Sequence, residues 1–188
     1  MARHGWARHS AVVLGAVAAF VAISVFAEWP WWEYAFMSDG SPVAWLSSAL
    51  LVANAAVALN LALSRSLRPG PGYILAAALA TLAVDEQFQL HERLKDSMGG
   101  GAAGNAPTWL VGIGGLACLA VLMRIVKSRA ARGLIAAAVA LGIFALWVDL
   151  GTPPAVLARS EELYEVLAES LFLCGLLEVP RSQVHSGS

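Results

Sequence analysis

Charged residues are scarce in this chain. Only 13% of the 188 residues are Asp, Glu, Lys or Arg, and 59% are hydrophobic. Soluble domains are roughly 45–50% apolar and about 25% charged. The composition therefore excludes an ordinary soluble domain, and it predicts an all-α integral membrane protein.

Cysteine is rare as well, which excludes several kinds of site. The two cysteines, Cys118 and Cys174, lie inside apolar runs without a C-x-x-C neighbour. We expect them to be packing residues rather than a disulfide or a metal pair. The chain also lacks a Ser-His-Asp grouping, a P-loop and a C-x-x-C-H motif. Neither a nucleotide nor a haem is expected as a cofactor.

Long apolar runs dominate what is present. A bilayer core about 30 Å thick requires roughly 20 helical residues, and Pro- and Gly-rich breakers separate six such runs. The predicted spans are residues 10–27, 42–63, 72–91, 107–126, 132–150 and 161–177. Together they predict one transmembrane domain over residues 1–188, with a flexible cytoplasmic tail at 178–188. Residues 10–27 could alternatively belong to a cleaved signal peptide, because Arg3 and Arg8 precede them.

The two signs of charge fall on opposite sides of these spans. Of the 12 Lys and Arg residues, all but Arg93, Lys95 and Arg159 lie on the side of the two termini. Of the 13 acids, all but Glu178 lie on or near the other side. The positive-inside rule then predicts six spans in a bacterial inner membrane, with both termini cytoplasmic and an acidic periplasmic face. The basic residues follow this topology, so the lipid bilayer is the expected partner and no nucleic acid is required.

Two of the predicted spans carry acids, which cost several kcal/mol each at membrane depth. On the third span Asp85, Gln89 and Glu92 fit one helical stripe, and on the sixth Glu162, Glu165 and Glu169 fit another. The stripes are expected to face each other or a hydrated cleft. Helix rise places Asp85 level with Glu169, and His91 and Glu92 level with Glu162.

Carboxylates and an imidazole packed in this way suit a divalent metal such as Fe, Mn or Zn. The candidate ligands are Asp85, Glu86, His91, Glu92, Glu162, Glu165 and Glu169. Gln89, Asn54 and Asp149 are expected to support the site without contacting the metal. Glu86 lies about 100° from Asp85 around a straight helix, so the two cannot point at one atom unless the helix bends.

Three functions stay open at this point. A bound metal reached by a small molecule or ion from the outer side would permit oxidoreductase or hydrolase chemistry. The same acids could form a proton- or cation-coupled transport path, or the chain could be an accessory subunit of a larger membrane complex with unknown partners. The acids stop halfway across the predicted membrane, which favours a pocket.

The motifs Asp85-Glu86…His91-Glu92 and Glu161-Glu162…Glu165…Glu169-Ser170-Leu171-Phe172 resemble those of small, uncharacterised bacterial polytopic membrane proteins. This resemblance covers mainly the third and sixth spans and implies no activity. A more distant comparison is with the membrane hydrolases of the alkaline ceramidase and adiponectin-receptor superfamily, whose zinc is held by histidines on several spans. Here His91 is the only histidine within a predicted span, which argues against that chemistry.

Overall fold

A computed structural model describes residues 5–36, 40–97, 116–117, 119–150, 154, 157 and 160–179. The side chains of residues 5–7, 91–92, 95–96 and 149–150 also fall outside the description. Cys118 and the predicted tail from residue 180 onward belong to the parts left undescribed, as does the first half of the predicted fourth span.

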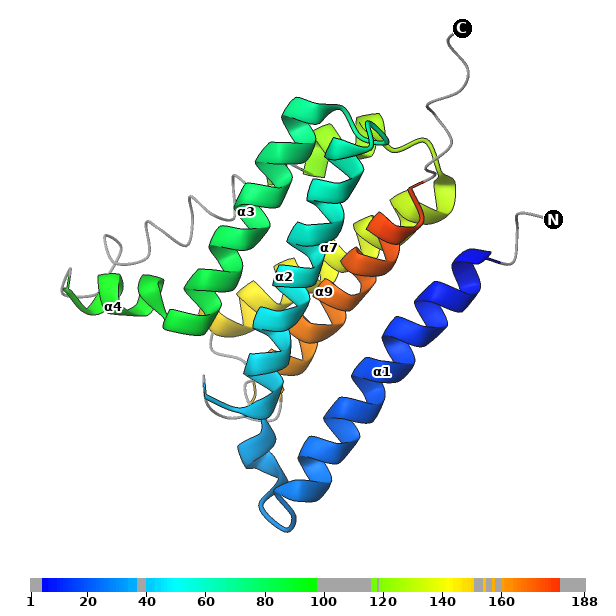
Figure 1. Cartoon of the computed structure of the whole chain (residues 1–188). Coiled ribbons are helices and arrows are strands. Elements are labelled where there is room, and N and C mark those ends of the chain that lie inside the picture. Colours follow the sequence, from blue (N-terminus) through cyan, green and yellow to red (C-terminus); the bar gives the residue numbers. More distant parts are fainter. Residues whose placement is uncertain are drawn as a thin grey trace, which may run out of the picture.

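All the regular structure that is described is helical (Figure 1). The elements are α1 (Gly5–Ala27), the short 3-10 helix η2 (Trp32–Ala35), α2 (Pro42–Leu63), α3 (Pro69–Phe88), α4 (Leu90–Ser97), α7 (Arg129–Leu150) and α9 (Glu161–Leu177). Residues 116–117 and 119–125 are also helical. The prediction of an all-α fold is confirmed over the described residues.

Helix α2 is the centre of the bundle, with α3 on one side and α9 on another. It begins where the sequence predicts, because the Ser41 hydroxyl accepts a hydrogen bond from the Ala44 amide at 3.1 Å and Pro42 occupies the first turn. Close packing of α2 against α3 depends on a glycine, Gly72, which has no side chain. A Cβ atom on Gly72 would lie 2.6 Å from the Cβ of Ala62, which is far inside a normal contact.

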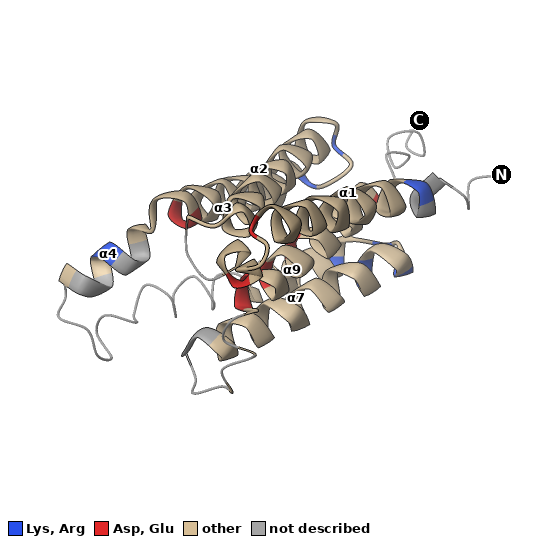
Figure 2. Cartoon of the chain, turned by 90° about the horizontal axis from the view of Figure 1, so that it is seen from below, with Lys and Arg blue, Asp and Glu red and all other residues tan. Residues whose placement is uncertain are grey.

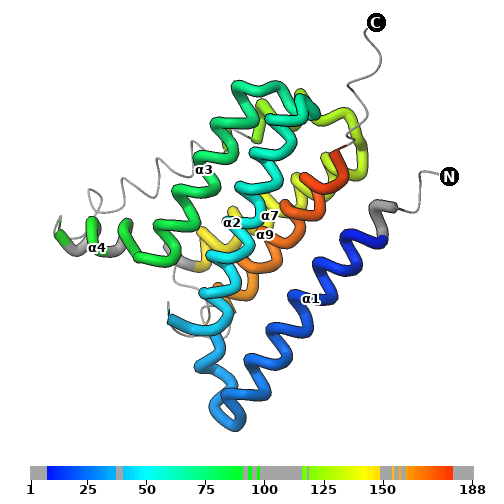
Figure 3. The backbone as a smooth tube through the Cα atoms, in the orientation of Figure 1, coloured from blue at the N-terminus to red at the C-terminus, as the bar shows by residue number. Residues whose placement is uncertain are grey.

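Helix α3 differs from the predicted third span, because it ends at Phe88 rather than at residue 91. Gln89 takes a left-handed conformation, with φ 53° and ψ 43°, and a residue in this region ends an α-helix. The chain then continues as α4, which bends away from the axis of α3 (Figure 3). Asp85, Gln89 and Glu92 therefore do not form the continuous stripe expected of a straight helix.

Helices α7 and α9 form the second close pair. A Cβ atom on Gly175 would lie 2.7 Å from Cγ1 of Ile135 and 3.3 Å from the carbonyl oxygen of Ala131. Small residues at helix contacts are typical of membrane bundles, where they allow backbones to approach closely. Nearby, Cys174 is a buried free thiol, in keeping with a packing residue.

Three helices within the described ranges are long and apolar enough to cross a membrane: Arg8–Ala27, Pro42–Leu63 and Arg129–Val148. Helix α1 packs only lightly on the bundle and exposes large apolar side chains such as Ile23 and Phe26, which suits contact with lipid. Helix α9 is shorter, at 17 residues. Membrane-helix character is thus supported, while the count of six spans stays a prediction.

The charges separate along the helix axes (Figure 2). Apart from Arg93 on α4, the basic residues of the described chain gather where α1 begins, between α2 and α3, and where α7 begins. The acidic residues at the end of α3 and the start of α9 lie in the opposite half. This arrangement brings acids from two helices that are far apart in the sequence to one end of the bundle.

Candidate metal centre

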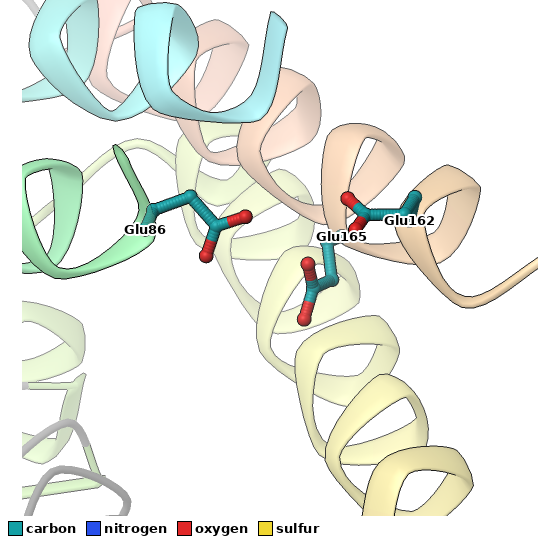
Figure 4. A group of neighbouring side chains, drawn as sticks. All are labelled: Glu86, Glu162 and Glu165. Carbon is teal, nitrogen blue, oxygen red and sulfur yellow. The ribbon is translucent and has the colours of Figure 1, made fainter. Parts of the chain in front are cut away.

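Three glutamates from two helices converge at the acidic end of the bundle (Figure 4). Glu86 comes from the last turn of α3, and Glu162 and Glu165 come from the first turns of α9. One carboxylate oxygen from each lies within 4.8 Å of the others, and all three side chains are partly buried. We call these three residues the glutamate cluster.

The spacing of the glutamate cluster fits a shared divalent cation. Metal–oxygen distances in proteins are about 2.0–2.6 Å, so two oxygens on one ion lie at most about 4–5 Å apart. Carboxylates this close repel one another when they are ionised, and a cation between them would relieve that repulsion. The arrangement can therefore hold a metal ion with ligands from α3 and α9.

Glu169 lies one turn deeper on α9 than Glu165, and its carboxylate contacts α2. The Ser47 hydroxyl donates a hydrogen bond of 2.8 Å to Oε1 of Glu169, and Ser47 is fully buried. Charges on Glu165, Glu86 and Glu162 act on this carboxylate. Glu169 is thus linked to the glutamate cluster by electrostatics and to α2 by a direct bond.

Asn54 joins α2 to α9 at the same level. Its side chain is fully buried, and its amide nitrogen donates to the carbonyl oxygens of Leu50 and Glu169, each at 3.0 Å. The sequence predicts Asn54 as a supporting residue of the acidic site, and its hydrogen bond to the Glu169 backbone ties it to α9.

The remaining predicted ligands lie elsewhere or outside the description. Asp85 is partly buried on α3 but does not belong to the glutamate cluster. His91 and Glu92 lie on α4, and Asp149 lies near the end of α7; the side chains of all three are outside the described residues. Gln89 occupies the break between α3 and α4.

Two features of this region are not predicted by the sequence. Ser160 is the N-cap residue of α9, but its hydroxyl makes no capping hydrogen bond. It donates to the carbonyl oxygen of Leu157 at 3.2 Å and accepts from the Tyr164 hydroxyl at 3.0 Å. Sequence reasoning also misses Ser47 as the partner of Glu169. Its position in the sequence could have indicated this role. Ser47 lies seven residues before Asn54, so the two polar side chains share one face of α2.

Comparison with known proteins gives a family but no activity. The model of a family described as a domain of unknown function (DUF8692) matches residues 21–179. No curated protein and no solved structure matches the chain.

Proposed function

We propose a function from the site itself, because the chain belongs to the DUF8692 family and the description of that family names no activity. The protein is a helical membrane bundle that binds a divalent cation at Glu86, Glu162 and Glu165. The observation that carries this proposal is the convergence of three carboxylate oxygens from two helices within 4.8 Å. These oxygens belong to helices packed on a common partner, α2, so the bundle holds them in place.

The donor atoms favour one of the metals suggested by the sequence. Carboxylate oxygens suit hard cations such as Mg²⁺, Ca²⁺ and Mn²⁺, and all three described donors of the glutamate cluster are carboxylate oxygens. Among Fe, Mn and Zn, we therefore propose Mn²⁺ as the best match. A metal in this position would supply a Lewis acid, or would activate water or oxygen for an incoming substrate.

The proposed topology places this site at the periplasmic face of the inner membrane. Helices α3, α9 and residues 107–126 would cross the bilayer in addition to α1, α2 and α7, giving six spans with both termini in the cytoplasm. The separation of basic and acidic residues to opposite ends supports this orientation (Figure 2). Exposed Trp29, Trp31 and Trp147 at the acidic end suit a membrane interface.

A path for protons or cations is the competing function. Along α9 a series of acids runs inward: Glu162, Glu165 and Glu169. Such a series could pass protons or cations from one carboxylate to the next. The next residues on that face, Phe172 and Leu176, are apolar. The described acids therefore favour a pocket open to the outer side over a path through the membrane.

A third function is that of an accessory subunit in a larger membrane complex. Co-purification of partner proteins in mild detergent would detect it.

Metal binding is tested by Mn²⁺ titration of the full chain in nanodiscs of zwitterionic lipid, with elemental analysis after equilibrium dialysis. We expect saturable binding of about one Mn²⁺ per chain, reversed by a chelator, because one group of three carboxylates fits one ion. Empty nanodiscs measure binding to lipid. Mn²⁺ content that rises without saturation, or that equals the empty nanodiscs, would contradict the proposal.

A further inference from the structure

A cavity of about 300 Å³ lies beside Glu169, on the inner side of the glutamate cluster. Side chains of α2, α3, α7 and α9 line it, together with Leu116, Leu119 and Leu122. Nearly all are Leu, Ile, Val, Ala or Phe, and the exceptions are Gly142, Asn54 and Glu169. Pockets for small molecules begin at about this size and are mostly apolar with a few placed polar groups.

Each of the two polar side chains that line the cavity has a buried oxygen without a described donor. Oδ1 of Asn54 and Oε2 of Glu169 are buried and accept no hydrogen bond from any residue the structure describes. The orientation of the Asn54 amide is fixed chemically, because its nitrogen donates to two carbonyl oxygens and the opposite orientation would set oxygen against oxygen. Leaving a buried acceptor unpaired costs about 1–3 kcal/mol. A ligand that brings a donor to these two atoms would recover that free energy.

We infer that this cavity binds a lipid-soluble alcohol, with its apolar chain among the leucines and its hydroxyl between Asn54 and Glu169. With a neutral Glu169, a hydroxyl donates to Oδ1 of Asn54 and accepts from the carboxyl group, so both are paired. With an ionised Glu169, it donates to one of the two oxygens. An ammonium head group would suit only the ionised form. The alcohol would enter from the bilayer, and its hydroxyl would lie one helical turn from the glutamate cluster.

This inference does not depend on metal binding. The oxygens of Asn54 and Glu169 and the apolar lining are present whether or not the glutamate cluster holds an ion. Its position suggests that the alcohol is presented to the metal centre, but the binding itself is tested without metal.

The test uses a hexadecanol that carries a photoreactive diazirine in its chain, with the full-length protein in nanodiscs and a chelator present. Crosslinked peptides are identified by mass spectrometry. We expect saturable labelling on the cavity-lining parts of α3, α7 and α9. Hexadecanol should compete at least about tenfold better than hexadecane, because the alkane leaves both oxygens unpaired.

A matched pair of variants on α7 locates the labelled site. Gly142 lines the cavity, and a Cβ atom added to it would meet nothing within 4 Å. Gly133, on the same helix, has equal space but does not line the cavity. Gly142→Leu should fill the cavity and lower labelling at least about fivefold, because a packed interior leaves no room for the chain. Gly133→Leu should leave labelling unchanged.

Several outcomes would overturn the inference. Labelling that does not saturate, or that spreads over lipid-facing surfaces, would mean that the cavity holds lipid chains or water without selection. Equal competition by hexadecane would mean that the oxygens of Asn54 and Glu169 do not contribute to binding. Stronger competition by hexadecylamine than by hexadecanol would mean that the cavity prefers a cationic amphiphile to an alcohol. Loss of Mn²⁺ binding alone would contradict the proposed function and leave this inference intact.

Discussion

Replacing Glu165 by Gln is expected to weaken Mn²⁺ binding by at least about 10–100-fold, since loss of even an indirect partner of a metal commonly has that effect. Gln keeps the size of the side chain and removes the charge. Glu86→Gln should have an effect of similar size, although it lies on α3 rather than α9. Both variants are measured by the same titration as the unaltered protein.

Glu161→Gln is the matched control for these variants. It removes the same charge from the first turn of α9, next to Glu162 but outside the glutamate cluster. We expect less than about a threefold change in affinity, because a charge that does not contact the ion acts through screened electrostatics. If Glu161→Gln weakened binding as much as Glu165→Gln, general attraction of cations would explain the binding. If Glu86→Gln had no effect, α3 would not contribute a ligand.

Gly175→Val is expected to destabilise the bundle by about 1–3 kcal/mol or more, because the side chain has no room between α9 and α7. Its Cβ would lie 2.7 Å from Cγ1 of Ile135 and 3.3 Å from the carbonyl oxygen of Ala131. Both neighbours are fully buried, so neither can move toward solvent. Reversible unfolding in mixed micelles, followed by circular dichroism, measures the change.

Gly133→Val is the control for this prediction. It introduces the same side chain on α7 where nothing lies within 4 Å of the new Cβ atom, and surface substitutions of this kind usually change stability by less than about 0.5 kcal/mol. Equal stability of Gly175→Val and Gly133→Val would show that α7 and α9 do not pack as closely as described. Because α9 carries Glu162 and Glu165, Gly175→Val should also weaken Mn²⁺ binding.

The sequence predicts the bounds of two helices well, and a local start signal explains one of them. It predicts spans at residues 42–63 and 161–177, and α2 and α9 have these bounds. Pro42 after Ser41 provides a local start signal for α2. For α3 the predicted end is wrong, because Gln89 is not a residue type that marks a left-handed helix end. Its conformation is set by the fold around it.

The candidate site is harder to predict than the helices. Glu162 and Glu165 belong to one predicted stripe on α9, and the structure places both in the glutamate cluster. On α3 the sequence cannot decide between Asp85 and Glu86, because helical periodicity gives relative angles and not the rotation of the helix against its neighbours. The contact of Ser47 with Glu169 is not predicted for the same reason, because it depends on how α2 packs against α9.

The most direct measurement for the proposed metal centre is an anomalous difference map from crystals of the full chain grown with Mn²⁺. We predict a peak at the acidic end of the bundle, about 2.0–2.6 Å from carboxylate oxygens of Glu86, Glu162 and Glu165. A peak at other residues, or no peak at a Mn²⁺ concentration that saturates the titration, would contradict the assignment of this site.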